Sequence, residues 1–509
     1  MDELRSDLLA LVVSYLSLKD ALACRLVCKR LAGLGQHYPE VWERRALSVE
    51  DGPTACPLLR LAPCARVLST AVPATAPRCH HGDLRTTACA ARELSISMKR
   101  VRTEDAAEAV QIIKRQEALG RLRAVRLHFD VDDGASATED AVASLFGTLS
   151  STPGLEGVAL SGNMGDLRMS RVTGVRGSIK PSLKSFACHL APGMLPFFKC
   201  MLAGHASTLE AVHFDTSSAC SAAPAGSVAR LLAGLPRLRK LSCPLVPGLD
   251  KLAECESLRE VKLTVTRDGA DNADNAAGAA QLIGAEQLRS VHLCFLHGGA
   301  SSDDEYEDVD SDDSDIFGLF DEEPGEEVAR NLTMGLVMGD SKVEELFLEI
   351  EGESLQSVPV QLMLGLRYLP TLRRLRIKMC MFSVDEVLRG IFIFKLPSLQ
   401  SLQIVLQDGI DDGSSSRCCF HWFLHHDTVK KVLLKNPWLH VELQNAIFCK
   451  DVVSEETCEY CEPLVCHQEL YDVATPAEYV VGIFTHPPDA CPSAVHHASG
   501  RRWFHTSDL

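Results

Sequence analysis

A short apolar motif recurs along most of the chain. In each copy, apolar residues stand at the first, fourth and sixth positions, as in LRAVRL from Leu122 and LREVKL from Leu258. The spacing predicts a short strand whose fourth and sixth residues point into a core. Copies begin at Ala91, Leu122, Leu155, Leu183, Leu209, Leu238, Leu258, Leu288, Val343, Leu372, Leu399 and Val429.

The copies follow one another at nearly regular intervals. Ten of the eleven intervals lie between 20 and 33 residues, which is the period of a leucine-rich repeat of the longer type. A helical phrase such as EDAVASLFGTL or VDEVLRGIFIFKLP precedes nearly every strand. One strand and one helix per repeat predict an α/β solenoid, a horseshoe with parallel strands on its concave face and helices on its convex face. An ordinary α/β domain is the alternative, and it does not explain the spacing.

The repeats are degenerate at one position. The asparagine or cysteine expected eight residues after the first apolar residue occurs only at Asn163 and Cys380. An asparagine ladder between repeats is therefore mostly missing.

The one long interval, 55 residues, contains an acidic insertion. Residues 302–327 include fourteen Asp or Glu and no Lys or Arg, and removing these 26 residues leaves an interval of 29. Such a tract buries too little apolar surface to fold, so we predict a disordered acidic loop at residues 301–327. Its expected role is solubility. The alternative is an internal competitor for the target-binding surface.

The first forty residues are more apolar than a surface helix requires. Residues 7–16 are apolar almost all the way round a helix. Ser17 and Asp20 predict the start of a second helix, which the glycines at 33 and 35 are expected to end, and a third short helix follows. Three short helices cannot bury this surface among themselves, so the rest of the chain or a partner must cover it.

This segment resembles an F-box, whose pattern is roughly Leu-Pro-x-Glu-Leu-Leu-x-x-Ile-Phe-Ser-Tyr-Leu, then Asp-Leu, Val-Cys-Lys and a final Trp. The chain departs from it at Arg5, Asp7 and Leu31, where the family has proline, glutamate and an aromatic residue. The resemblance implies a three-helix domain at residues 1–47 that binds a small Skp-type adaptor. The residues that it implies would build or face the adaptor interface are Leu4, Leu8, Leu9, Val13, Leu16, Leu22, Val27, Cys28, Lys29 and Trp42.

An F-box followed by leucine-rich repeats implies the substrate-recognition subunit of an SCF-type (Skp, cullin, F-box) ubiquitin ligase. The adaptor links such a subunit to the cullin, and the repeats bind the target for ubiquitin-dependent degradation. The chain itself would be non-catalytic, and it contains no phosphate loop, G-x-S-x-G elbow or H-E-x-x-H motif. The alternative is a repeat scaffold without a ligase role, in which the N-terminal helices only cap the solenoid.

A target-binding surface can be placed on the strands. Their third, fifth and seventh positions point away from the core, onto the concave face. A basic C-terminal end of this face would attract an acidic or phosphorylated target, and a solvated face of unpatterned charge is the alternative. The candidates are Arg126, His128, His213, Lys262, His292, Arg374, Arg376, Lys378, Lys431 and Lys435.

Composition limits the partners and the compartment. The formal net charge is −17, and fourteen of these negative charges lie in the insertion, which argues against nucleic-acid binding. No apolar run approaches the roughly 18 residues of a membrane span, and no signal peptide is expected. Twenty scattered cysteines are expected to be reduced thiols, which predicts an intracellular protein of the cytoplasm, the nucleus or both.

The predicted boundaries are residues 1–47 for the F-box, 48–90 for a linker or irregular first unit, and 91–445 for the solenoid. A C-terminal extension, residues 446–509, ends in a flexible tail. Its Cys458, Cys461, Cys466 and His467 form C-x2-C-x4-C-H, a set that could hold a structural zinc. A second paired knuckle is missing, so structural thiols are favoured, and no metal or cofactor is predicted.

Overall fold

A computed structural model divides the chain into two compact units, Met1–Leu238 (unit 1) and Arg239–Leu509 (unit 2). The residues that the structure describes are 5–49, 55–73, 83–99, 102–130, 139–163, 179–190, 192–216, 225–266, 272–296, 324–339, 341–350, 363, 365–379, 384–394, 396, 398–406, 423–424, 426–444, 480–487, 490–491 and 502–506.

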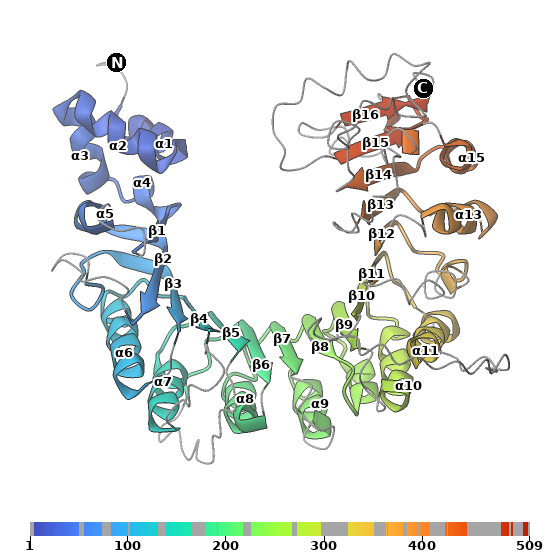
Figure 1. Cartoon of the computed structure of the whole chain (residues 1–509), viewed down its shortest axis with the longest axis horizontal. Coiled ribbons are helices and arrows are strands. Elements are labelled where there is room, and N and C mark those ends of the chain that lie inside the picture. The colour runs from blue at the N-terminus through green and yellow to red at the C-terminus, as the bar shows by residue number, and fades with distance from the viewer. Residues whose placement is uncertain are drawn as a thin grey trace, which may run out of the picture. The chain divides into compact units, whose positions relative to one another are not determined.

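Unit 1 begins with four short helices and continues as alternating strands and helices. The opening helices are α1 (Ser6–Tyr15), α2 (Leu18–Val27), α3 (Lys29–His37) and α4 (Glu40–Glu43). The strands are β1 (Ala46–Ser48), β2 (Cys64–Val72), β3 (Ala90–Met98), β4 (Ala124–Asp130), β5 (Gly157–Asn163), β6 (Ser185–Leu190) and β7 (Ala211–Thr216). The helices between or after them are α5 (Ala55–Leu61), α6 (Thr103–Ala118), α7 (Glu139–Ser151), α8 (Leu195–Gly204) and α9 (Ala225–Ala233). Each strand is parallel to the next, and the helices cover one face of the sheet (Figure 1).

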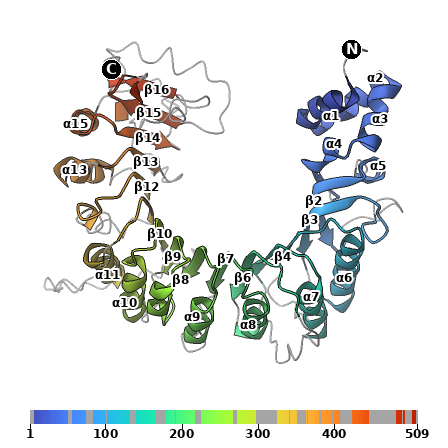
Figure 2. The same cartoon turned by 180° about the vertical axis from the view of Figure 1, so that it is seen from behind.

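Unit 2 repeats this alternation. Its strands are β8 (Lys240–Pro244), β9 (Glu260–Thr266), β10 (Ser290–Leu296), β11 (Glu345–Ile350), β12 (Arg374–Met379), β13 (Ser401–Leu406), β14 (His440–Gln444), β15 (Val480–Phe484) and β16 (Arg502–His505). Its helices are α10 (Asn272–Ile283), α11 (Pro324–Met338), α13 (Val384–Phe394) and α15 (Asp427–Lys435). Strands β8 to β14 are parallel, whereas β15 runs antiparallel to β14. The helices again lie on one face, as the reverse view also shows (Figure 2). This arrangement confirms the predicted solenoid of parallel strands and helices.

The core of each sheet consists of two columns of apolar side chains. They are the fourth and sixth positions of the motif, which the parallel register places side by side on neighbouring strands. In unit 2 one column is Leu241, Val261, Val291, Leu346, Leu375, Leu402 and Val441. All of these side chains are buried. The third, fifth and seventh positions lie on the face without helices, which we call the open face.

A ladder of backbone hydrogen bonds joins the repeats just before each strand. The carbonyl oxygen at the second motif position accepts from the N–H groups of the second and third positions in the next repeat. Arg259 O, for example, accepts from Arg289 N at 2.9 Å and Ser290 N at 3.1 Å. The same pair of bonds recurs at the carbonyls of Arg123, Glu156, Lys184, Arg239, Arg289, Glu344 and Arg373. We call this feature the entry ladder, and it joins the repeats without an asparagine ladder.

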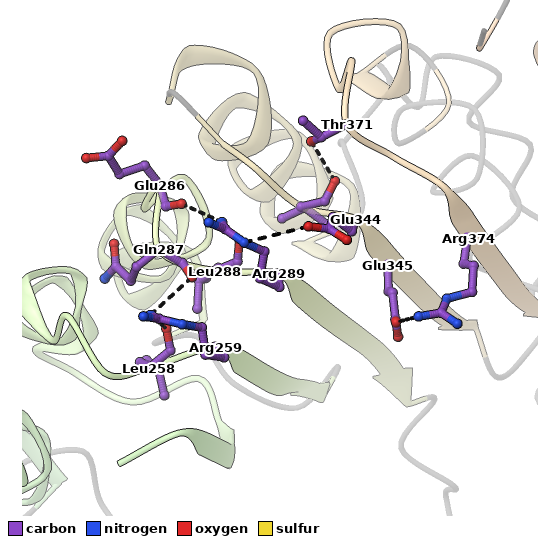
Figure 3. A network of polar contacts seen from close by, with 11 residues as sticks. Leu258, Arg259, Glu286, Gln287, Leu288, Arg289, Glu344, Glu345, Thr371 and Arg374 are labelled. Carbon is purple, nitrogen blue, oxygen red and sulfur yellow. Dashed lines mark hydrogen bonds and ion pairs between the residues drawn. The ribbon is translucent and has the colours of Figure 1, made fainter. Parts of the chain in front are cut away.

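Side chains reinforce the entry ladder in unit 2 (Figure 3). Arg289 donates from Nη1 to the carbonyls of Leu288 and Glu286, at 2.9 and 2.8 Å, and its Nε lies 3.7 Å from Glu344 Oε1. Thr371 Oγ1 donates to Val343 O of the preceding repeat, at 2.9 Å. These bonds satisfy carbonyl groups between helix and strand that the sheet itself leaves unpaired.

The last motif copy is part of a helix and not of a strand. VKKVLL, from Val429, was predicted to be a strand, but it lies in helix α15. Val429, Val432 and Leu433 are buried while Leu434 is exposed, so the apolar spacing is that of a helix and not of a strand. The strand of this repeat is β14. Lys431 and Lys435 therefore lie on a helix and not on the predicted strand face.

The described ends of the solenoid are more regular than predicted. Residues 48–90, expected to be a linker or irregular unit, contain α5 and strand β2, which pairs in parallel with β3 along its length. The C-terminal extension contains β15 and β16, and β16 lies within residues 484–509, which were expected to be a flexible tail. Residues 301–323 of the acidic insertion lie outside the described residues, and Pro324 already begins α11.

The predicted second helix of the N-terminal segment is divided. It ends at Val27, since Cys28 has an extended backbone, and α3 then runs through both glycines that were expected to terminate a helix. Cys28 Sγ accepts from Leu31 N at 3.5 Å at the start of α3. The predicted cap of the second helix is confirmed, because Asp20 N donates to Ser17 Oγ at 3.1 Å. Among the described residues, no helix combines the length and apolar character needed to cross a membrane.

Helices α10 and α11 pack at close range through glycines. A Cβ atom at Gly335 would overlap the backbone of Ala280, including its carbonyl oxygen, and one at Gly284 would overlap Gly335 O. These contacts are between backbones, which cannot move aside as a flexible side chain can. Only glycine permits this approach of the two helices.

We therefore expect Gly335→Ala to lower the free energy of unfolding of unit 2 by about 1–3 kcal/mol, because it overpacks the helix contact. Gly147→Ala in α7 is the matched control, because a Cβ at Gly147 meets no atom within 4 Å. That substitution should be neutral or should stabilise by about 0.5–1 kcal/mol. Urea unfolding followed by circular dichroism measures both variants. Equal effects of the two substitutions would contradict the close packing.

Candidate functional site

Helix α1 has two apolar faces. One face packs inside the N-terminal helices, with Leu9, Ala10 and Val13 buried. The other is exposed and carries Leu8, Leu11, Val12 and Tyr15, at the i, i+3, i+4 and i+7 positions of one helical stripe. Leu26 and Val27 at the end of α2 are also exposed, at 89% and 66%. We call these six residues the α1–α2 face.

The α1–α2 face stands out in the part of the chain that the structure describes. Among all the residues that the structure describes, twelve large apolar side chains are exposed, and six of these twelve lie between residues 8 and 27. Exposed apolar residues scattered singly are ordinary, but the four residues of α1 form one stripe, and a contiguous apolar stripe marks an interaction surface.

Arg45 fixes the end of α1. Its guanidinium donates to Val13 O, Leu16 O and Val41 O, at 2.8, 3.1 and 2.7 Å. These bonds satisfy carbonyl groups at the end of a helix. Burial lowers the pKa of the Arg45 guanidinium below its ordinary value, but arginine remains charged. The buried charge is thus compensated by helix-end carbonyls.

Trp42 holds α3 and α4 together. The indole is 2% exposed, and its Nε1 donates to Gly35 O at 2.8 Å. A Cβ at Gly35 would lie 2.9 Å from that Nε1 atom, which explains why glycine stands here inside a helix. Helix α4 in turn packs on β2.

The residues predicted to build or face an adaptor interface divide into two groups. Leu9, Val13 and Trp42 are interior and build the helical cluster, whereas Leu8, Val27, Cys28 and Lys29 are exposed. Leu16 and Leu22 are half-buried, and Leu4 lies outside the described residues. Leu11, Val12, Tyr15 and Leu26 were missed, although the apolar pattern all round α1 contained the signal for three of them.

A second candidate group of side chains lies on the open face of unit 2. Strands β9 to β12 bring together Lys262, His292, Phe347, Glu349, Arg376 and Lys378, which we call the β9–β12 cluster. Glu349 is its centre. Its carboxylate lies 2.6 Å from Lys378 Nζ, 3.3 Å from His292 Nε2 and 4.0 Å from Lys262 Nζ.

Phe347 lies between the imidazole of His292 and the guanidinium of Arg376. The His292 ring centroid is 3.9 Å from the Phe347 centroid, and the Arg376 guanidinium carbon lies 4.8 Å from it on the next strand. Among the described residues, no carboxylate lies within ion-pair distance of Arg376. Its charge is therefore held over an aromatic face and is not neutralised by a carboxylate.

The environment fixes the ionisation of the cluster. Burial, together with the charge of Lys262, lowers the pKa of His292 to about 4, against the opposing effect of Glu349. Burial opposes ionisation of Glu349, but hydrogen bonds from Lys378 and Cys294 and the neighbouring cations lower its pKa below the ordinary value. At neutral pH the cluster has three cations, one carboxylate and an uncharged imidazole, a formal charge of +3 − 1 = +2.

The predicted target-binding residues do not form one basic end. Arg374 pairs with Glu345 and Lys378 with Glu349, so neighbouring glutamates compensate both. In unit 1, Arg126 pairs with Glu93 at 2.6 Å. His128 contacts Ser161 and His213 contacts Asp215 on the open face. Lys431 and Lys435 are excluded from this face because they lie on α15.

The remaining predicted site, Cys458, Cys461, Cys466 and His467, lies outside the described residues. The ten cysteines whose side chains the structure describes are free thiols, and six of them are buried.

Comparisons with known proteins identify the N-terminal helices. The F-box domain pattern matches residues 2–34, a segment that contains the whole α1–α2 face. The chain thus carries an F-box domain at its N terminus, followed by the solenoid of parallel strands and helices described above. None of the curated proteins compared with the chain is significantly similar to it. Among solved structures, one from yeast, entitled "Crystal structure of Rad7 and Elc1 complex in yeast", is similar to this chain. The identity is 13%, with coverage of 81% of this chain and 92% of that one and a TM-score of 0.33.

The pKa of His292 predicts a pH dependence. Its value in the folded chain, about 4, is lower than the ordinary 6.5, so the unfolded chain takes up this proton first as the pH falls. The free energy of unfolding of unit 2 should therefore be highest above pH 6.5. It should decrease by about 1–2 kcal/mol as the pH falls toward 4. This decrease is smaller than the full pKa difference would give, because the His292 ring is partly exposed to solvent.

Urea unfolding at several pH values, followed by tryptophan fluorescence, measures this decrease in the full chain and in His292→Gln. Three of the four tryptophans are in unit 2. Burial also lowers the pKa of His205 in unit 1, but that histidine contributes equally to both proteins. The difference between the two profiles therefore isolates His292, and identical profiles would show that the assignment is wrong.

Proposed function

We propose that the protein is the substrate-recognition subunit of an SCF-type ubiquitin ligase. The F-box would bind a Skp-type adaptor, and through it a cullin, while the solenoid would bind the target protein. Ubiquitin transfer would be performed by other subunits, so the chain would act by bringing the target close to the charged enzyme. Such a role places the protein in the cytoplasm, the nucleus or both.

The observation that carries this proposal is the α1–α2 face. The helices already use one face of α1, together with Val41 and Trp42, to build their own core. The six exposed residues are additional to that core and lie within the matched F-box segment. Burying such a stripe against a partner is the kind of interaction that the hydrophobic effect favours, with about 1.5–3 kcal/mol for each fully buried large side chain.

The target would bind to the open face of unit 2, at the β9–β12 cluster. A formal charge of +2 and an arginine over an aromatic ring suit an acidic or phosphorylated segment. The aromatic and arginine residues at its centre are also the types that dominate interface energies. Glu349 would hold the two lysines and orient them toward the ligand.

A scaffold without a ligase role is the second candidate. It is favoured by the packing of α4 on β2, because these helices cover the end of the solenoid as a cap must. A cap does not require the α1–α2 face to be exposed, so adaptor binding separates the two candidates.

Replacement of Leu8 and Val12 by Asp should reduce affinity for a Skp-type adaptor at least tenfold, which is about 1.4 kcal/mol, because each charge would enter an apolar contact. Both residues are exposed, so the fold should be retained. The matched control is Ile393→Asp with Leu434→Asp, two exposed apolar residues of α13 and α15. Co-purification and titration calorimetry with the adaptor measure the effect. Unchanged binding by the Leu8/Val12 variant would favour the scaffold.

Arg376→Glu should reduce the capture of acidic or phosphorylated peptides from a peptide library at least tenfold, because it reverses the charge over Phe347. Arg374→Gln is the control and should have little effect, since Arg374 is already paired with Glu345. Equal losses in the two variants would indicate a diffuse charge effect and not a site at the β9–β12 cluster.

A further inference from the structure

Three potential metal ligands meet at the C-terminal end of unit 2. His440 is in β14, His486 follows β15 by two residues, and Cys491 is five residues further on. One ring nitrogen of each histidine and the thiol sulfur all lie within 4.8 Å of one another. His440 and His486 are buried, and Cys491 is half-buried.

The spacing is close to that of zinc ligands. Cys491 Sγ lies 3.4 Å from His440 Nε2. In a tetrahedral zinc site, nitrogen and sulfur ligands are about 3.3–3.6 Å apart, given their usual distances from the ion. This pair already has that separation, and the ligand atoms of the other two pairs lie within 4.8 Å of each other. His486 and Cys491 also have the short sequence spacing of paired zinc ligands.

Backbone carbonyls orient both histidines. His440 Nδ1 lies 3.2 Å from Gln400 O, and His486 Nδ1 lies 3.0 Å from Pro437 O. Because a carbonyl oxygen only accepts, each Nδ1 must be the protonated nitrogen, and the lone pair of each ring is then on Nε2. A histidine whose second nitrogen donates to a carbonyl is the usual arrangement in metal sites, since it fixes the tautomer and the ring orientation.

The surroundings are aromatic. Phe484 is buried, with its ring centroid 5.3 Å from that of His486, and the Trp503 ring lies 5.3 Å from that of His440. Trp438 approaches His486 from the loop before β14, at 5.5 Å. These rings pack against both imidazoles and help to hold them in place.

We propose that His440, His486 and Cys491 bind one zinc ion, with a water molecule as the fourth ligand. Binding converts the thiol to a thiolate and releases its proton to solvent. Strand β15 is antiparallel to β14. The ion would connect β14 to the segment that follows β15 and would thereby stabilise the C-terminal end of unit 2. The proposed site uses none of the residues Cys458, Cys461, Cys466 and His467, and it is independent of the ligase proposal.

Zinc content of the purified full chain, equilibrated with zinc alone and then desalted, tests the site. One equivalent should be lost in Cys491→Ser and in His486→Gln. Replacing Cys458 and Cys461 by Ser should not remove that equivalent. Absence of zinc from the wild-type protein would overturn the proposal, as would retention of all zinc by Cys491→Ser or its loss only from the Cys458/Cys461 variant.

A second measurement needs no variant and covers the case in which a substitution prevents folding. Alkylation of each thiol is followed by mass spectrometry with zinc and with a chelator. Zinc should slow alkylation of Cys491 several-fold, because a coordinated thiolate is a poor nucleophile, while exposed Cys28 should react equally in both conditions. Equal rates at Cys491 with and without zinc would overturn the site.

Discussion

The rest of the structure depends on the parallel register that the entry ladder fixes before each strand. Its hydrogen bonds join backbone to backbone, so the second motif position can be Arg, Glu or Lys without loss of pairing. A shift of one residue would move every apolar side chain of a strand to the open face. Because the ladder sets the register, the apolar columns meet in the core, and the odd positions meet on the open face. The β9–β12 cluster exists because three intervals of different length, 30, 55 and 29 residues, return to the same register.

The two candidate surfaces follow different physical rules. The α1–α2 face consists of apolar side chains left over after a small core is complete. The β9–β12 cluster consists of charges held partly out of water, where one carboxylate organises two lysines and a neutral imidazole. The first surface is suited to a large, dry contact, and the second to a charged segment whose partners it selects by sign.

The sequence predicted most of the fold, because LxxLxL and the repeat period report on local geometry and on core formation together. The prediction failed where the same apolar spacing fits both a strand and a helix. Val429, Val432 and Leu433 are such a case, because they form the buried face of a helix. It also failed at Gly35, because the contact with Trp42 is made by residues that a helix-propensity argument does not consider. The pairing of Arg374 and Lys378 with glutamates of β11 was not predicted, since it depends on the register between β11 and β12. His440, His486 and Cys491 lie close together because β15 runs antiparallel to β14, a pairing that the repeat pattern does not predict.

The contacts of Arg45 determine how a partner bound to the α1–α2 face would be oriented. Its side chain holds the end of α1, while its carbonyl oxygen accepts from Arg66 N and Val67 N at the start of β2, at 2.9 and 3.3 Å. Arg45 therefore holds the helices with its side chain and pairs with the sheet through its backbone. Because β1 begins at Ala46, directly after Arg45, no linker separates the helices from the sheet in unit 1. A protein bound to the α1–α2 face would therefore have a fixed orientation relative to β1 and β2. The fold itself, and not a flexible linker, would set the distance between that protein and the first strands.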